Sequence, residues 1–452
     1  MTRQRLYLGI DIGTQGARAL AVTVDGTVRA RGECALPVPA PGPIQEQRPE
    51  EWWQALIGAV RALGDARDDI VSMAVSCTSG SVCAIDAAGE AVGPGLLYAD
   101  RRAVVTEGAD ASWAVAKIAW LIGEGVSLVP DARSFTSPGG YAASRLMGAT
   151  APIDVTQALK FGFDPAHHRW GSLPVDADRL PEVVDTGRPI GTIDRAAAAA
   201  TGLPLGIEVV SGLTDGVAGH LACAPTPQRW AVAIGSTIVW KAMSDHRIDV
   251  PGAGIYSHRG PLGWWFPGAA SNAGARVLST WADPARVADL ADRLAVTPAI
   301  DAVYPSVVPG ERFPFVDPDF QPVPFDGRSE TDRFAAEVLG LAFVERWGCE
   351  ELVGHGCETP TSIATTGGVV ASESVTRLRA EVLQLPIEVP AEPSSAFGAA
   401  IVAAAPTRGG VLDAARAMVD ISRRIEPSAD DRWTLAYRRF RERIVQARKE
   451  AV

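Results

Sequence analysis

The chain has 452 residues, 47% hydrophobic content and a formal net charge of −11, which is enough for two or three domains with their own cores. The acidic balance argues against nucleic acid or an acidic membrane surface as the main partner. No run reaches the roughly 18–20 apolar residues of a membrane-spanning helix, and the N-terminus meets an acid before a signal-like apolar stretch develops. Six cysteines include no CxxC pair, so we expect reduced thiols in a cytoplasmic protein without a membrane partner.

The opening stretch YLGIDIGTQGARALAVT predicts a β-hairpin with strands at 6–12 and 17–24. The glycine-rich turn at 13–16 offers backbone N–H groups and a hydroxyl that could hold phosphate oxygens. Asp11 interrupts the first strand, and a half-buried carboxylate is costly unless a cation compensates for its charge. Mg²⁺ beside nucleotide phosphates is one such cation. An aspartate that caps its own turn is the structural alternative.

The following elements alternate between strands and helices. Strands are expected at 70–77 and 82–86, and a loop-rich stretch at 164–192. One helix is expected to begin near 48, and further helices are expected at 112–123, 139–148, 330–357, 372–383, 394–405 and 429–448.

The hairpin pattern returns at 229–243, where RWAVAIGSTIVWKAM again places a hydroxyl-bearing glycine turn between two apolar strands. Either turn alone also suits an ordinary hairpin. As a pair, they indicate two similar domains with a nucleotide held between them. The Ala-Pro-Thr-Pro stretch predicts a boundary near 225, which gives an N-terminal domain at 1–225 and a C-terminal domain at 226–452.

Two further strand ends carry candidate chemistry. In VVSGLTDGVAGHLA (209–222), Asp215 follows a strand and opens a helix; it is either a helix cap or the base that accepts a hydroxyl proton during phosphoryl transfer. In SIATTGGVVASESV (362–375), the paired glycines 367 and 368 let a base and ribose approach the backbone, although a plain tight turn has the same composition.

The ordered set of motifs resembles the FGGY family of carbohydrate kinases over nearly the whole chain. The motifs are GIDIGTQGARA, EQRPEEWW, LLYADRRA, SGLTDGVAGHLA, AIGSTIVWKA, PGERFP, TTGGVVASESV and SSAFGAAIVAAA. The resemblance implies an α/β fold of two actin-like (ribonuclease H-like) domains that flank a nucleotide cleft, with ATP and Mg²⁺ as cofactors.

The resemblance also implies roles for individual residues. Asp215 would be the catalytic base, and Asp11 would lie near magnesium. The implied ATP-binding residues are Gly13, Thr14, Gln15, Gly235, Ser236, Thr237, Gly274, Gly367, Gly368 and Ser372. The implied sugar-binding residues are Thr78, Ser79, Gly80, Tyr98, Asp100, Lys160 and Asp215. Lys160 has an equally plausible packing role against Phe161. Val369 and Arg377 depart from the usual glycine and glutamine of the adenosine motif.

The sugar is less clearly specified. The block SCTSGSVCAID (76–86) replaces the Gln-Met-His-Gly signature of xylulokinases, and the sequence looks most similar to the short D-ribulokinase branch. We therefore expect an ATP-dependent kinase that phosphorylates a ketopentose, with D-ribulose first. The alternatives are a kinase for D-xylulose or another polyol, a non-catalytic sugar or nucleotide sensor, and an actin-like ATPase. The sequence is also compatible with a homodimer.

Overall fold

The computed structural model describes residues 4–103, 111–123, 129–171, 175–176, 179–322, 325, 329–368 and 372–450. The chain forms two compact units. The first comprises Met1–Pro225, Arg259–Gly263 and Glu392–Val419, and the second comprises Thr226–His258, Trp264–Ala391 and Asp420–Val452. A single boundary at 225 therefore differs from the structure, because two later segments return to the first unit.

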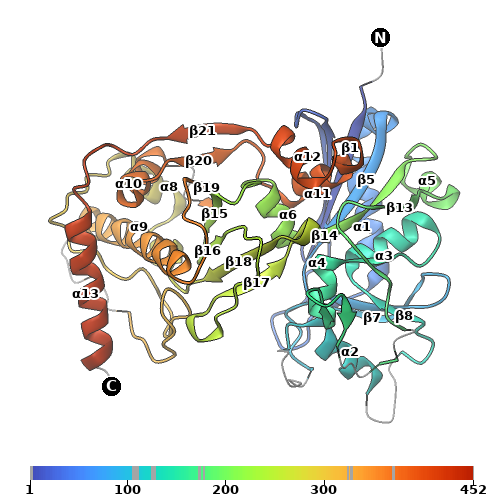
Figure 1. Ribbon diagram of the computed structural model, residues 1–452, viewed down its shortest axis with the longest axis horizontal. Coiled ribbons are helices and arrows are strands. Elements are labelled where there is room, and N and C mark those ends of the chain that lie inside the picture. The colour runs from blue at the N-terminus through green and yellow to red at the C-terminus, as the bar shows by residue number, and fades with distance from the viewer. Residues whose placement is uncertain are drawn as a thin grey trace. The chain divides into compact units, whose positions relative to one another are not determined.

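The first unit is built on a mixed sheet with the strand order β13–β14–β5–β1–β2–β3 (Figure 1). The strands are β1 (Leu6–Gly13), β2 (Gly16–Thr23), β3 (Val28–Ala35), β5 (Ile70–Cys77), β13 (Pro189–Thr192) and β14 (Glu208–Thr214). Strands β1, β2 and β3 are antiparallel neighbours, whereas β5 pairs in parallel with β1 and with β14. The carboxyl ends of β1, β5 and β14 consequently meet at one edge of the sheet.

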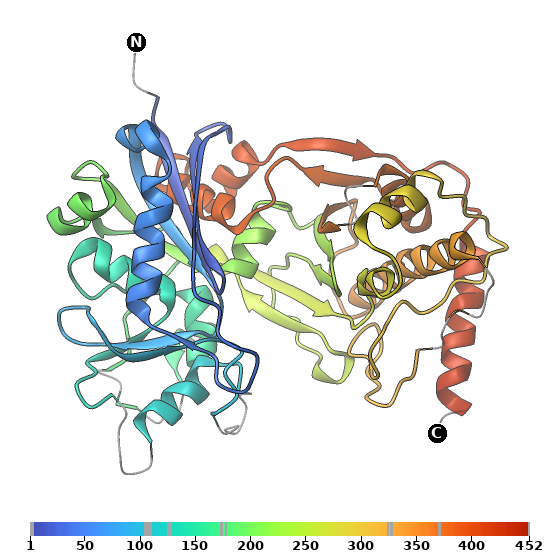
Figure 2. The same ribbon diagram turned by 180° about the vertical axis from the view of Figure 1, so that it is seen from behind.

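Helices cover both faces of this sheet. Helices α1 (Pro49–Arg61), α3 (Pro138–Met147) and α5 (Arg195–Thr201) belong to one side, and Figure 2 shows α1 lying over that face. Helices α6 (Asp215–Leu221), α11 (Ser395–Ala404) and α12 (Val411–Met418) belong to the other. Helix α11 lies directly on β1, since a Cβ atom at Gly9 would be 1.9 Å from the Ala396 carbonyl oxygen. Because strand side chains alternate, Gly9 and Asp11 share the face that α11 covers.

The remaining elements of the first unit form smaller pieces. A second sheet has the order β4–β7–β6–β8, with β4 (Glu46–Gln47), β6 (Val82–Ile85), β7 (Ala91–Leu96) and β8 (Ser134–Thr136). The other elements are α2 (Ala114–Ile122), β9 (Ile153–Asp154), α4 (Val155–Ala158), the 3₁₀ turn η2 (Leu159–Phe161), β10 (Phe163–Asp164), β11 (Arg169–Trp170) and β12 (Val183–Val184). The stretch 164–192, expected to be loop-rich, thus contains short strands, and its last strand, β13, joins the main sheet as an edge.

The second unit repeats this arrangement with the strand order β17–β18–β16–β15–β19–β20–β21. Its strands are β15 (Arg229–Ile234), β16 (Ile238–Lys241), β17 (Tyr256–Arg259), β18 (Trp265–Ala270), β19 (Ser362–Thr366), β20 (Ile387–Pro390) and β21 (Ile421–Ile425). Strands β18, β16 and β15 are antiparallel, β15, β19 and β20 are parallel, and β21 is antiparallel to β20. The hairpins β1–β2 and β15–β16 therefore hold equivalent places in two sheets of the same topology, as the repeated sequence pattern predicted.

The helices of the second unit include α7 (Arg276–Ser279), α8 (Pro284–Asp292), α9 (Glu330–Gly354), α10 (Glu373–Leu383) and α13 (Thr434–Glu450). Their apolar side chains form a core with Trp230, Trp240 and Phe313 of the strands and loops. The helices expected from the sequence all appear within a few residues of their expected positions.

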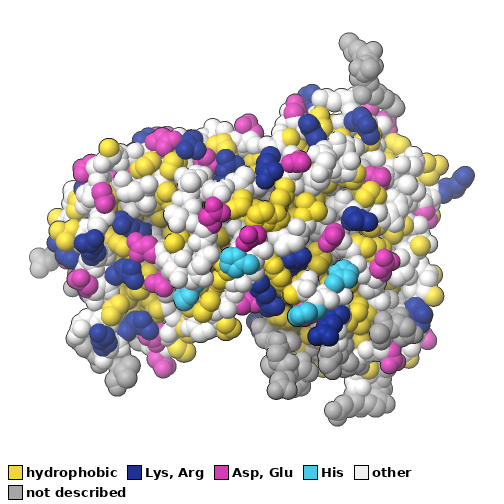
Figure 3. Space-filling view, viewed as in Figure 1, with side chains coloured by type: hydrophobic (Ala, Val, Ile, Leu, Met, Phe, Trp, Pro, Cys, Tyr) yellow, Lys and Arg dark blue, Asp and Glu magenta, His cyan; other side chains and the backbone are white. Residues whose placement is uncertain are grey.

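Charge is evenly spread over the surface in view. Acidic and basic side chains are interspersed across the face in Figure 3 rather than gathered by sign. Within the described ranges, none of the helices combines the length and apolar character needed to span a membrane.

Candidate active site

Asp11 lies on β1 next to the strand ends of the first unit. Asp11 is 7% exposed, and its Oδ1 accepts a hydrogen bond of 2.7 Å from Ser76 Oγ on the neighbouring strand β5. Arg18, opposite Asp11 on β2, is 3.8 Å away and about half exposed. The partner on β5 distinguishes this arrangement from an aspartate that caps only its own turn.

The surroundings of Asp11 oppose its charge. Burial is the largest influence and raises the pKa of the carboxyl from 3.8 to about 6. The hydrogen bond from Ser76 lowers this pKa, the Asp215 carboxylate raises it, and Arg18 lowers it. Asp11 and Asp215 therefore interact as like charges, and a cation between them and a phosphate would relieve the repulsion.

Asp215 is the first residue of α6, immediately after β14. Its Oδ1 accepts a hydrogen bond of 2.7 Å from the N–H of Gly216, and its carbonyl oxygen accepts one of 3.1 Å from Ser395 Oγ on α11. Thr214 caps the helix position without a side-chain cap bond. A partly exposed carboxylate at the carboxyl edge of the sheet can serve as a general base.

The predicted sugar loop follows β5. Thr78 begins it, and its N–H donates to the Ile12 carbonyl at 3.4 Å, which places the loop beside the end of β1. Gly80 adopts a φ of +86°, and a Cβ atom there would lie 2.2 Å from the Ser112 carbonyl and 3.1 Å from Lys160 Cδ. Lys160 on η2 thus approaches this loop. Ser79 Oγ is buried without a hydrogen-bond partner among the described residues, so a ligand hydroxyl could satisfy it.

Tyr98 and Asp100 lie in the loop after β7. Tyr98 is 44% exposed, whereas Asp100 is fully buried. The Asp100 carboxylate accepts hydrogen bonds of 2.8 Å from Gln45 N and from Arg102 Nη2. Burial raises the pKa of Asp100, but these donors and the Arg102 charge outweigh it and leave the pKa lowered. Asp100 therefore has a structural task in holding its loop, and Tyr98 is the more accessible of the two.

The turn 13–16, predicted to hold phosphate, is anchored through its carbonyl groups. Gln47 Nε2 donates to the Thr14 carbonyl at 2.9 Å, and Leu36 N donates to the Gln15 carbonyl at 2.9 Å. Trp52 Nε1 in turn donates to Gln47 Oε1 at 2.8 Å. The turn that begins at Gly13 is thus held from the protein side, as a rigid phosphate cradle requires.

The second predicted phosphate turn, residues 235–237, is packed against a backbone segment that is distant in sequence. A Cβ atom at Gly274 would lie 2.2 Å from the Ser236 carbonyl and 2.5 Å from Thr237 Cα, so only glycine fits there. Ala275 N donates to the Gly235 carbonyl at 2.7 Å. At Gly367, a Cβ atom would lie 2.3 Å from the Ile234 carbonyl. The structure therefore brings Gly235, Gly274 and Gly367 of the predicted ATP-binding glycines together around this turn.

An apolar cavity of about 390 Å³ adjoins the same turn. Its lining comprises Ala275, Leu278, Ser279, Ala282, Pro284, Val287, Ala288, Ala291, Asp292, Phe334, Val338, Leu341, Gly368, Ser372 and Val375. Ala275 contributes to this lining and also bonds to the Gly235 carbonyl. The cavity has the size and apolar character of a small-ligand site and lies where a base and ribose would follow phosphates held at the turn.

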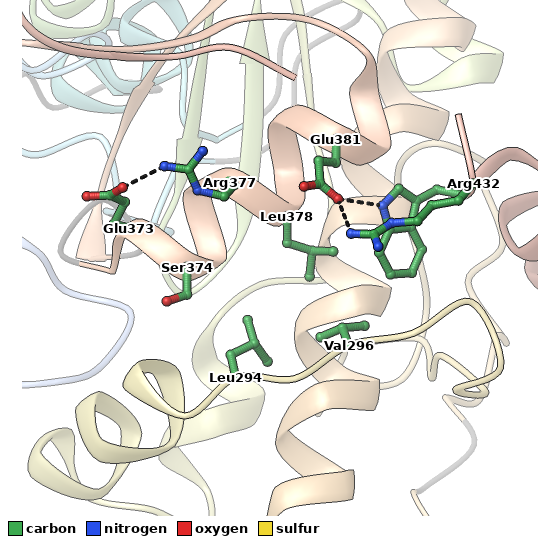
Figure 4. Close-up of a pocket in the computed structure, with 9 residues that line it drawn as sticks. Leu294, Val296, Glu373, Ser374, Arg377, Leu378, Glu381 and Arg432 are labelled. Carbon is green, nitrogen blue, oxygen red and sulfur yellow. Dashed lines mark hydrogen bonds and ion pairs between the residues drawn. The ribbon is translucent and has the colours of Figure 1, made fainter. Parts of the chain in front are cut away.

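Two residues of the predicted adenosine motif, Ser372 and Arg377, also form contacts within the protein. Ser372 caps α10 by accepting from Val375 N at 3.3 Å and also lines the cavity. Arg377 forms an ion pair of 2.7 Å with Glu373 and lines a separate pocket with Leu378, Glu381 and Arg432 (Figure 4). Its departure from glutamine therefore falls outside the cavity lining. Val369 lies outside the described residues.

Sequence reasoning missed several residues of these sites. Ser76 and Ser395 are small hydroxyl residues in apolar segments, and only strand register and helix packing bring them to Asp11 and Asp215. The apolar residues of α7, α8 and α9 that line the cavity read as ordinary core positions. No local sequence signal distinguishes Ser76, because its role depends on the register between β1 and β5.

Comparison with known proteins identifies the family. Residues 6–108 match the N-terminal domain of the FGGY family of carbohydrate kinases, and residues 232–406 match its C-terminal domain. The chain belongs to the FGGY family. It is therefore an ATP-dependent carbohydrate kinase, as the motifs predicted.

Relatives of this FGGY kinase match between half and nearly nine tenths of its length. It is 25% identical to the xylulose kinase of Escherichia coli K12 over 88% of this chain and 89% of that protein. It is 27% identical to the xylulose kinase of Streptomyces coelicolor over 68% of each chain. The crystal structure of xylulose kinase from Rhodospirillum rubrum has the same fold, with a TM-score of 0.84, 22% identity and coverage of 98% of this chain and 99% of that one. Erythritol and glycerol kinases also occur among the relatives.

Proposed function

We propose that this FGGY kinase transfers the γ-phosphoryl group of ATP to the terminal hydroxyl of a ketopentose, with D-xylulose as the first candidate. Support for D-xylulose comes from relatives named xylulose kinase that match most of the chain. D-ribulose, favoured by the sequence blocks, becomes the second candidate. The block 76–86, which lacks the Gln-Met-His-Gly signature, is the observation that keeps D-ribulose in view.

Asp215 is the proposed base. It accepts the proton of the sugar hydroxyl while the hydroxyl oxygen bonds to the γ-phosphorus and ADP leaves. Support comes from its place after β14 and from its interaction with Asp11. The loop 78–80 and Tyr98 supply the proposed sugar contacts, with hydroxyl groups that can donate to and accept from a polyol.

Mg²⁺ fits the acidic residues of this site. Asp11 is a buried carboxylate whose pKa is raised by burial and by Asp215, so a bound cation would stabilise its charged form. No cluster of three or more His, Cys, Asp or Glu side chains could hold a metal alone in the described part of the chain, and Mg²⁺ characteristically uses one or two carboxylates with waters and phosphates. When bound, the ion would neutralise phosphate charge.

ATP is proposed to lie along the second unit's turn and cavity. The bond from Ala275 N to the Gly235 carbonyl carries this assignment, because Ala275 also lines the apolar cavity. The phosphates would lie at 235–237 and the adenosine near Gly368 and Ser372.

The test is ADP release measured with purified protein across D-xylulose, D-ribulose, other ketopentoses, aldoses, pentitols, erythritol and glycerol. The proposal expects the highest kcat/KM with D-xylulose. A higher value with D-ribulose would restore the sequence-based first choice. Ligand binding without sugar-stimulated ADP release would identify a sensor, and sugar-independent ATP hydrolysis would identify an ATPase; either result contradicts the proposal.

A further inference from the structure

Thr156 lies in the short helix α4, which contacts β14 just before Asp215 (Figure 1). Its hydroxyl donates to Asp154 Oδ1 at 2.5 Å and accepts a hydrogen bond of 2.8 Å from the N–H of Thr214. Thr214 is the residue that precedes Asp215 and caps its helix. A single buried hydroxyl thus connects Asp154 to the backbone that carries the proposed base.

The direction of these bonds follows from Asp154. Its Oδ1 also accepts from the N–H groups of Thr156 and Gln157, at 2.9 and 3.0 Å. Because this oxygen is an acceptor, the Thr156 hydroxyl proton points toward it, and a lone pair remains for the Thr214 N–H. Asp154, Thr156 and Thr214 are each at most 6% exposed, so water competes little for these bonds.

Gln157 makes the second connection. Its Nε2 donates to the Cys77 carbonyl at 3.1 Å and to the Leu213 carbonyl at 3.3 Å. Cys77 immediately precedes the loop 78–80, and Leu213 lies two residues before Asp215. The side chain is 1% exposed. One amide group therefore joins the end of β5 to the end of β14.

The strand pairing between β14 and β5 is irregular near this place. The register shifts between Val210 and Leu213, and pairing resumes at Leu213↔Ser76 and Thr214↔Cys77. The bonds from Thr156 and Gln157 reach these last paired residues and so add to the pairing where both strands end.

We propose that Thr156 and Gln157 are positioning residues that fix Asp215 relative to the sugar loop 78–80. The inference rests on the proposed roles of Asp215 as base and of this loop in sugar binding. A displacement of about 1 Å between reacting groups costs on the order of 100-fold in rate. Loss of either connection should therefore lower kcat by more than the accompanying loss of folding stability accounts for.

The test compares Thr156→Val with Thr156→Ser in the sugar-stimulated ADP-release assay. Valine keeps the shape but removes the hydroxyl, and serine restores it. We expect Thr156→Val to lower kcat roughly 10- to 100-fold with the KM for ATP within about twofold, and Thr156→Ser to stay within about threefold of wild type. A kcat for Thr156→Val within about twofold of wild type would overturn the inference.

Thr201→Val is the matched control. Thr201 is fully buried in the same unit, and its hydroxyl donates to the Ala197 carbonyl and accepts from Leu203 N at the end of α5. The Thr201→Val variant loses two hydrogen bonds, as Thr156→Val does, but neither of them reaches the 213–215 segment. If Thr156 has a positioning role, Thr201→Val should keep its kcat although its melting temperature is comparable to that of Thr156→Val. Equal kcat losses in Thr156→Val and Thr201→Val would mean a purely structural role and would refute the inference.

Two further variants keep the result interpretable. If Thr156→Val does not fold, Gln157→Met tests the second connection with the same expectation, and an unchanged kcat refutes the inference. Asp215→Asn is measured in parallel. If Asp215→Asn retains its kcat, the proposed base is wrong; if Asp215→Asn is inactive while Thr156→Val is fully active, only the positioning inference is wrong.

Discussion

Asp11 shows how a single residue can be costly for folding and suited to ligand binding. Its carboxylate is buried on β1, near Asp215, and Ser76 and Arg18 are the groups among the described residues that compensate for its charge. In the protein without ligands, the neutral form is therefore favoured up to a pH of about 6. A bound cation would reverse this preference.

The Asp11→Asn variant should be more stable than the wild type at pH 7.5. The folded-state pKa of about 6 is above the unfolded value near 3.8, so the wild type is most stable below the lower value and loses stability as the pH rises through this window. The loss is about 3 kcal/mol at most. We expect the variant to gain roughly 1–3 kcal/mol of folding stability at pH 7.5, as measured by urea unfolding between pH 4 and 8. The variant should also lose kinase activity.

Asp68→Asn is the control for this experiment, because Asp68 is an exposed aspartate in the same unit. Its unfolding should follow the pH dependence of the wild type. A wild-type pH profile in Asp11→Asn would show that burial does not perturb this carboxyl.

At the residue scale, the sequence identified polar groups that break an apolar pattern. Asp11 interrupts a strand and Asp215 opens a helix, and both interact in the structure. Ser76 and Thr156 could not be found this way, because their roles depend on which strands pair and in which register. A small hydroxyl side chain inside an apolar segment carries no signal until its neighbours are known.

At the scale of elements, the two hairpins were predictable because each combines period-two apolar residues with a glycine turn. Their equivalence follows from the identical strand directions around β1 and β15. The cavity beside the second turn was not predictable beyond its glycines and Ser372. Leu278, Val287 and Phe334 line it from three different helices, and their spacing resembles that of any core residue.

Gly274→Ala should disrupt the turn 235–237, where ATP phosphates are proposed to bind. The added Cβ would lie 2.2 Å from the Ser236 carbonyl, so the turn must move to accommodate it. We expect the KM for ATP to rise at least tenfold while the KM for the sugar changes little, as measured by ADP release.

Gly252→Ala provides the comparison, because a Cβ atom at Gly252 in the same unit would meet no atom within 4 Å. Its kinetic constants should match those of the wild type. An unchanged KM for ATP in Gly274→Ala would argue against ATP phosphates at 235–237.

At the scale of the whole molecule, the order of the chain conceals how the first unit is completed. Residues 392–419 return to this unit between two segments of the second unit. Helix α11 packs against β1 and β5, and Ser72 Oγ donates to the Ala403 carbonyl at 2.6 Å. Sequence reasoning identified α11 as a helix of small residues but assigned it to the C-terminal domain, because nothing local in a small-residue pattern states which sheet it covers.

A fragment of residues 1–225 should therefore fail to fold cooperatively, since the α11 face of β1 and β5 would be exposed to water. The same fragment joined to 392–419 by a Gly/Ser linker should recover a cooperative transition in thermal unfolding followed by circular dichroism. Cooperative unfolding of 1–225 alone would show that α11 is dispensable for this unit.

The most direct test of the proposed mechanism is the kcat of Asp215→Asn in sugar-stimulated ADP release, measured with ATP binding on the same sample. Asparagine keeps the size of the side chain and removes the proton acceptor. We predict that kcat falls by well over a hundredfold while ATP still binds with nearly wild-type affinity. Turnover close to that of the wild type would contradict the assignment of Asp215 as the base.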